Sequence, residues 1–126
     1  MKIIFILLIF IFPNIASAKN LNFTKIVNLK SPWGSTFIDD NNILITEKSG
    51  AIKLINIKNK NIDIINHNIN FLEHGQGGLL DVLFNENFVY ISYSENRGNG
   101  KTSTSIARSK FDKKDLIFKN IFQANP

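Results

Sequence analysis

Residues 33–57 read WGSTFIDDNNILITEKSGAIKLINI, and this stretch decides the fold class. It holds short apolar runs separated by turn-forming residues, DDNN at 39–42 and KSG at 48–50. Short runs rich in β-branched and aromatic residues, bounded by Asp, Asn, Ser and Gly, are typical of antiparallel strands. We therefore expect tight turns that join strands over residues 33–38, 43–47 and 51–57.

The same order of strands and turns returns over residues 79–111, with strands expected over 79–84, 88–94 and 102–111. Further strands are predicted over 62–66 and 117–122, and an edge strand over 23–29, where apolar and polar residues alternate. A repeat of about 40–50 residues with several short strands per unit is typical of propeller blades. A small β-sandwich also has short strands at regular spacing, so spacing alone leaves both all-β architectures open. No stretch has the pattern of an amphipathic helix.

The chain opens with the features of a secretory signal peptide. Lys2 precedes an unbroken apolar run over residues 3–12, and Ala16-Ser17-Ala18 supplies the small residues of a cleavage site. A run of this length would rise only about 15 Å as a helix, against a hydrocarbon core of roughly 30 Å. We expect a signal peptide over residues 1–18, cleavage after Ala18 and no stable membrane anchor thereafter. The domain over residues 19–126 is then periplasmic or secreted.

Composition removes several function classes. The formal charge is +5, but the lysines are scattered and form no basic stripe, so nucleic-acid binding is not expected. The chain has no cysteine and only two histidines, a poor composition for a metal site. Without disulfides, the fold must be stabilised by its apolar core.

The stretch EHGQGG at residues 73–78 is the strongest candidate for a binding site. Three glycines in four positions exclude regular structure and permit close backbone approach. The amide of Gln76 both donates and accepts hydrogen bonds, so it suits a carboxylate or a sugar hydroxyl. The alternative is that Gln76 only caps a turn. His74 beside Glu73 suggests a general base, but we interpret it as a solvated loop residue, and His67 has no partner in the sequence.

Five segments, in order and spacing, resemble the opening of the glucose/sorbosone dehydrogenase family, the soluble aldose dehydrogenases that depend on pyrroloquinoline quinone (PQQ). The most specific segment is GQGGLLDV at 75–82. The resemblance implies a six-bladed β-propeller with the quinone at one end of its central channel, and a calcium ion that polarises the quinone. It also implies oxidation of a sugar at its anomeric carbon, with a histidine as base. The segments are Pro32-Trp33-Gly34, Phe37, 44–50, 75–82 and 89–93.

For this chain the resemblance implies about the first two blades of that propeller. Gln76 is the one residue that matches a family position in the cofactor and sugar pocket. The family's catalytic histidine belongs to a later segment that this sequence does not contain, so we expect no catalytic residue and no metal ligand here. We therefore expect an N-terminal fragment of a periplasmic PQQ-dependent aldose sugar dehydrogenase. Alone it should be inactive and bind neither PQQ nor calcium; a sugar would be its substrate once the other blades are supplied.

Two alternatives stay open at this point. One is a small exported β-sandwich that acts as a binding or interaction protein. The other is a propeller protein that shares the architecture but not the chemistry, because a fold does not determine a function.

Overall fold

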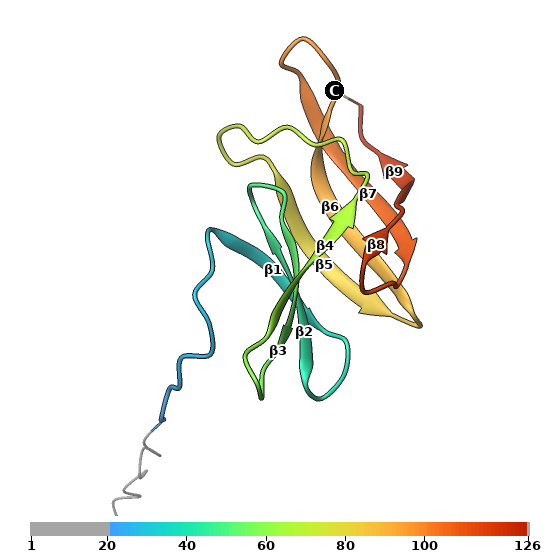
Figure 1. The fold of residues 1–126 in the computed structure, drawn as a ribbon. Helices are drawn as coiled ribbons and strands as arrows, with labels where there is room; N and C mark the ends of the chain where they lie inside the picture. The colour runs from blue at the N-terminus through green and yellow to red at the C-terminus, as the bar shows by residue number, and fades with distance from the viewer. Residues whose placement is uncertain (1–20, 126) are drawn as a thin grey trace, which may run out of the picture.

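The computed structural model describes residues 21–125, so the predicted signal peptide and Pro126 lie outside the described residues. The described residues form nine β-strands in two sheets (Figure 1). Within this range there is no helix with the length and apolar character that crossing a bilayer requires.

The first sheet, called the first blade here, is built from consecutive antiparallel strands. They are β1 (Pro32–Phe37), β2 (Asn42–Glu47), β3 (Ile52–Asn56) and β4 (Ile62–His67). A two-residue strand from the other half of the chain, β8 (Asp115–Leu116), adds to the edge of β4 in the parallel direction.

The second sheet, the second blade, is antiparallel throughout and has the order β5-β6-β7-β9. Its strands are β5 (Leu79–Asn85), β6 (Phe88–Asn96), β7 (Thr102–Lys110) and β9 (Lys119–Gln123). The two blades therefore repeat one plan of four strands, which confirms the all-β class and the repeat expected from the sequence.

Two features differ from the sequence-based expectations. The edge strand predicted over residues 23–29 is wrong: these residues pair with no strand in the described structure and instead line a groove on the first blade. Alternation gave the segment a strand-like pattern, but a strand must also lie beside a strand edge, and this segment lies along the face of the sheet. Conversely, β8 was not predicted, because two residues carry no periodicity and their partner lies far away in sequence.

The core lies between the two blades. Alternate residues of the central strands point into it and are almost fully buried: Leu44, Ile52, Leu54, Val82, Val89, Ile91 and Ala107. The innermost strands β1 and β5 pack against each other across this core. Their approach depends on Gly34, since a Cβ atom there would lie 2.7 Å from the Cα of Asp81.

Hydroxyl groups add a second, directional link between the blades. The buried hydroxyl of Thr46 accepts a hydrogen bond from the backbone N–H of Gly34 (3.1 Å) and donates one to the carbonyl of Leu80 (2.5 Å). The hydroxyl of Thr36 accepts from the N–H of Phe84 (3.2 Å). Because hydrogen bonds require particular geometry, these contacts fix how far one blade slides along the other.

Loops that follow alternate strands gather at one end of the molecule. The β2–β3 turn (48–50), the β4–β5 connection (68–78) and the β6–β7 loop (97–101) all lie at the upper end in Figure 1, where β9 also finishes. In antiparallel sheets this follows directly from strand direction. The glycine-rich segment is therefore at the same end as two other loops and the end of β9.

We expect Gly34→Ala to loosen the contact between the blades, because the new methyl group would overlap the backbone of β5. Overpacking of this kind costs about 1–3 kcal/mol. Amide hydrogen exchange in β5 should accelerate by about 5- to 150-fold, the equivalent of that cost. Ser35→Ala, at the adjacent exposed position, is the matched control and should leave exchange unchanged. Equal exchange in both variants would contradict the role given to Gly34.

Candidate functional site

The glycine-rich loop (residues 73–78) is fastened at both ends to strand β6. Before the loop, Leu72 N–H donates to the carbonyl of Ser94 (3.0 Å), and after it Ser94 N–H donates to the carbonyl of Gly78 (2.9 Å). A tight turn closes the tip, where Gly77 N–H donates to the carbonyl of His74 (2.7 Å). The loop is thus a short projection with both ends fixed on one strand.

Gly78 sets the loop against the first blade. Its φ is +147°, and a Cβ atom would lie 2.2 Å from the carbonyl oxygen of Lys48. No other residue fits both the backbone angle and this distance. Lys48 also reaches the tip, because its Nζ donates to the carbonyl of Gly75 (2.5 Å). The glycine-rich loop is therefore held against the β2–β3 turn of the first blade at two points, Gly75 and Gly78.

Gln76 lies at the exposed tip of the loop. Within the described residues its amide makes no hydrogen bond, and the turn that contains it is closed by backbone atoms alone. Its donor and acceptor groups are thus available to a ligand. The geometry favours a binding role over the turn-capping alternative, and that role stays a prediction.

The two histidines have different surroundings. His74 and Glu73 are both exposed, and no ion pair joins them in the described structure. His67 is half-buried and does have partners, which the sequence did not reveal. Its Nδ1 accepts from Ile69 N–H (3.2 Å), so its Nε2 carries the proton and donates to the carbonyl of Gly50 (2.7 Å). His67 therefore holds the end of β4 to the β2–β3 turn.

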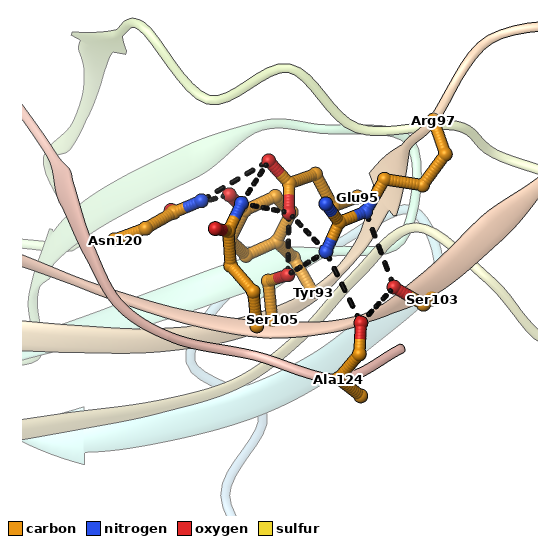
Figure 2. Close-up of polar contacts among 8 residues, drawn as sticks. Tyr93, Glu95, Arg97, Ser103, Ser105, Asn120 and Ala124 are labelled. Carbon is orange, nitrogen blue, oxygen red and sulfur yellow. Dashed lines mark hydrogen bonds and ion pairs between the residues drawn. The ribbon is translucent and has the colours of Figure 1, made fainter. Parts of the chain in front are cut away.

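A polar cluster that sequence reasoning missed occupies the same end of the second blade (Figure 2). Its centre is Glu95, which forms an ion pair with Arg97 (3.0 Å) and accepts a hydrogen bond from the buried hydroxyl of Ser105 (2.5 Å). The amides of Gln123 (2.9 Å) and Asn120 (3.0 Å) also donate to this carboxylate. Four side chains from the β6–β7 loop, β7 and β9 thereby converge on the one negative charge of Glu95.

The cluster holds β9 to the rest of the second blade, because Asn120 and Gln123 on β9 donate to Glu95 on β6. Burial alone would raise the pKa of Glu95, but the hydrogen bonds from Ser105, Gln123 and Asn120 and the charge of Arg97 outweigh burial and lower that pKa. Glu95 is therefore ionised at neutral pH. Arg97 additionally donates to the carbonyl of Ala124 (3.3 Å), just beyond β9. Every oxygen of the Glu95 carboxylate is occupied, so the cluster supports structure and offers little to a ligand.

The sequence held a faint signal for this cluster. Alternate residues of β6 up to Tyr93 are buried, and Glu95 is the next residue on that face of the strand. Tyr93 itself belongs to it: the phenol donates to the Oδ1 of Asn120 (2.7 Å), and burial raises the pKa of Tyr93. A charged residue at a strand end normally faces water, so no sequence rule singles out Glu95.

The residues described here do not by themselves form the cofactor sites that the family resemblance implies. Calcium takes about 6–8 oxygen ligands, and nowhere in residues 21–125 do three His, Asp or Glu side chains come together as a metal site. The amide of Gln76 lies on an exposed loop, and by itself it does not enclose a ligand of the size of a quinone. No step of catalysis is therefore assigned to this chain's residues.

A five-stranded and a four-stranded sheet, packed face to face with three loops at one end, define part of a β-propeller. The glucose/sorbosone dehydrogenase family matches residues 29–126, and the chain belongs to this family.

Relatives agree with this assignment. The aldose sugar dehydrogenase of Escherichia coli (strain K12) is 29% identical over an alignment of 107 positions that covers 78% of this chain and 29% of that protein. A crystal structure of a glucose dehydrogenase matches with a TM-score of 0.72 at 30% identity, over 78% of this chain and 31% of the other. The apo-form of the soluble E. coli aldose sugar dehydrogenase matches with a TM-score of 0.70 at 28% identity, again over 78% and 31%.

A more distant structure, the PQQ-bound form of an aldose sugar dehydrogenase from Streptomyces coelicolor, shares the fold with a TM-score of 0.67 at 20% identity. The chain thus spans about a third of the length of the proteins it matches. This chain forms two blades and covers 31% of the matched glucose dehydrogenase chain, so a whole chain of that length corresponds to about six blades. This agrees with the expected first two blades of a six-bladed propeller and removes the support for a self-contained sandwich.

We expect Glu95→Gln to release β9, because the variant loses the ion pair with Arg97 and weakens its hydrogen bonds. Hydrogen bonds to a charged group contribute roughly 1.5–3 kcal/mol, so the protection of β9 amides from hydrogen exchange should fall about tenfold or more at pH 7. Glu73→Gln, an exposed loop change, is the matched control.

The same variant tests the pH dependence. A lowered pKa in the folded state means that ionised Glu95 stabilises above the ordinary value of 4.5, and that this contribution disappears as the pH falls through the folded pKa. After correction for intrinsic exchange rates, β9 in the unmodified chain should lose protection below pH 4.5. In Glu95→Gln, the protection of β9 amides should not fall further below pH 4.5. If protection falls with pH in the variant as it does in the unmodified chain, Glu95 is not the group responsible.

Proposed function

We propose that this chain contributes the N-terminal third of a periplasmic, PQQ-dependent aldose sugar dehydrogenase that oxidises a sugar at its anomeric carbon. The observation that carries the proposal is the loop GQGG at residues 75–78, which is fixed to both blades and presents the amide of Gln76. Membership of the glucose/sorbosone dehydrogenase family supports it, as do relatives described as aldose sugar dehydrogenases. The predicted signal peptide over residues 1–18 supports export.

In this proposal Gln76 binds ligand and does not transfer protons. Its amide would bond a carboxylate of the quinone or a hydroxyl of the sugar, and the surrounding glycines keep side chains out of the way of a flat molecule. PQQ, when bound, supplies the hydride acceptor. The base and the calcium ligands would come from blades outside the described residues.

The exposed flanks explain why this chain alone should be inactive. Phe37 and Leu83, on opposite outer faces of the blade pair, are 59% and 57% exposed. Repeat units of this kind bury their faces against neighbours, and apolar faces left in water favour aggregation. Residues 19–126 mixed with PQQ, calcium, an aldose and a dye acceptor should therefore give no turnover.

A single-chain chimera tests the function of the loop. In it, residues 21–125 replace the matched part of the E. coli aldose sugar dehydrogenase. With PQQ, calcium and an aldose it should reduce the dye. Gln76→Ala should lower kcat/KM by roughly 5- to 100-fold, because a ligand loses a hydrogen bond of about 1–3 kcal/mol.

His74→Ala is the control, since His74 lies in the same exposed loop and is interpreted as solvated. Turnover by residues 19–126 alone would contradict the proposal. So would an active chimera in which Gln76→Ala and His74→Ala behave alike.

A further inference from the structure

Trp33 is the only tryptophan of the chain, and it is exposed at a place where the two blades otherwise pack closely. The residue is 47% exposed, although the next residue, Gly34, lies in the close backbone contact between β1 and β5. Tryptophan is on average a largely buried residue. The part of Trp33 that packing leaves uncovered is available to a ligand.

A β-bulge accounts for the exposure of Trp33. Pro32 pairs with Glu47 on β2, and Gly34 pairs with Thr46, so the register shifts between them. Trp33 is therefore an extra residue with no partner of its own in the ladder. Bulges bend a strand and re-aim a side chain, and they are frequent next to active sites. β1 is also the edge strand of its sheet, so in the described structure no strand pairs with its other side.

A carboxylate lies directly beside this bulge. β5 also begins with a register irregularity, between Leu79 and Val82, and Asp81 belongs to it. Asp81 is exposed, and its Oδ1 accepts a hydrogen bond from the N–H of Val82 (2.9 Å). A Cβ atom on Gly34 would lie 2.7 Å from that same Oδ1. The residue after Trp33 thus touches the Asp81 carboxylate, whose Oδ2 has no donor among the described residues.

Lys48, in the β2–β3 turn, is bonded to the start of both innermost strands and to the tip of the glycine-rich loop. Its N–H donates to the carbonyl of Ser31, just before β1 (3.0 Å), and its carbonyl accepts from the N–H of Leu79, the first residue of β5 (3.3 Å). Its Nζ donates to the carbonyl of Gly75 (2.5 Å). Three separate segments of the chain therefore meet around one lysine at the loop end of the molecule (Figure 1).

Trp33, Asp81 and Gln76 follow these three anchor points closely. Trp33 and Asp81 each lie two residues beyond their anchor point, and Gln76 lies one residue beyond its own. Two residues of a strand extend about 7 Å, so the three residues border one small area around Lys48. All three are exposed. An aromatic ring, a carboxylate and an amide are thus available together at the end of the molecule that carries the glycine-rich loop.

This set of groups suits a sugar. The C–H face of a sugar ring packs on an aromatic ring, and the indole adds one N–H donor. A carboxylate accepts strong hydrogen bonds from hydroxyl groups, and an amide both donates and accepts. Sites for small molecules combine aromatic surface with a few polar groups that fix the orientation of the ligand.

The quinone fits the same groups less well. PQQ is flat and could also stack on an aromatic ring, but it carries carboxylates, which the negative charge of Asp81 repels. A sugar is uncharged, and its hydroxyls can donate to Asp81. The observations therefore favour the sugar over the quinone as the ligand of Trp33 and Asp81.

We propose that Trp33 and Asp81 bind the aldose substrate, with the sugar ring stacked on the Trp33 indole and its hydroxyls donating to the Asp81 carboxylate. This inference rests on the proposed function and adds two substrate-binding residues to Gln76. Both residues hold and orient the sugar, and neither transfers a proton or a hydride. Their loss should therefore raise KM more than it lowers kcat.

The test measures sugar binding separately from turnover, in the single-chain chimera that carries residues 21–125. Saturation-transfer NMR gives the dissociation constant of D-glucose, with calcium and with PQQ in its reduced form so that no sugar is consumed. Trp33→Ala should raise this constant, and KM in the dye assay, roughly 5- to 100-fold, a range typical of stacking on an aromatic ring. Asp81→Asn keeps the size and the Oδ1 acceptor and should raise both roughly 2- to 10-fold.

The controls separate binding from folding. Trp33→Phe keeps an aromatic ring and should restore most of the affinity lost in Trp33→Ala. Ile64→Ala on β4, at a position that is 69% exposed and outside this area, is the matched control and should leave both constants unchanged. A PQQ titration of every variant should give no weaker binding than in the unmodified chimera. Trp33→Phe and Asp81→Asn keep the test valid if Trp33→Ala fails to fold.

Equal glucose binding by Trp33→Ala and the unmodified chimera, no glucose binding at all, or a larger loss of PQQ affinity than of glucose affinity would each overturn the role given to Trp33. A chimera that never reduces the dye but binds glucose through Trp33 supports this site and counts against the proposed function. A chimera that turns over sugar, depends on Gln76 and is indifferent to Trp33 and Asp81 gives the reverse result. The two ideas can therefore fail separately.

Discussion

The close approach of β1 to β5 is the constraint on which the rest of the structure depends. Gly34 allows the backbones to meet at Asp81, and the Thr46 hydroxyl then bridges from its own inner strand to Leu80 of the next blade. Apolar burial drives the two sheets together without regard to direction. The glycine contact and the hydroxyl bridge fix where one sheet sits on the other, because only one register satisfies both.

The position of the glycine-rich loop follows from that register. Once β5 lies beside β1, its first residues meet the β2–β3 turn, and Gly78 has to fit against the carbonyl of Lys48. Lys48 then secures the loop tip through Gly75. The exposed amide of Gln76 is thus placed by contacts that also join the blades, which links the binding role proposed for it to the packing of the fold.

Much of the fold is readable from local patterns, and the remainder depends on distant partners. Alternating apolar residues between Asp-, Asn- and Gly-containing turns predict every long strand, as at residues 43–47, because side chains on the two faces of a strand meet different surroundings. The same rule fails at residues 23–29, where alternation is present but the segment lies along the face of a sheet and pairs with no strand. It also misses β8 and the Glu95 cluster, whose partners lie in strands brought together only by the tertiary fold.

The described residues form two blades whose outer faces keep apolar side chains exposed. The most direct measurement is thermal unfolding of isolated residues 19–126, followed by calorimetry together with light scattering. Apolar side chains left exposed on both outer faces, Phe37 and Leu83 among them, predict a broad transition of low cooperativity, or soluble aggregates. A monomer that unfolds in one sharp, cooperative transition would contradict the account, because it would show that the two blades form a complete domain by themselves.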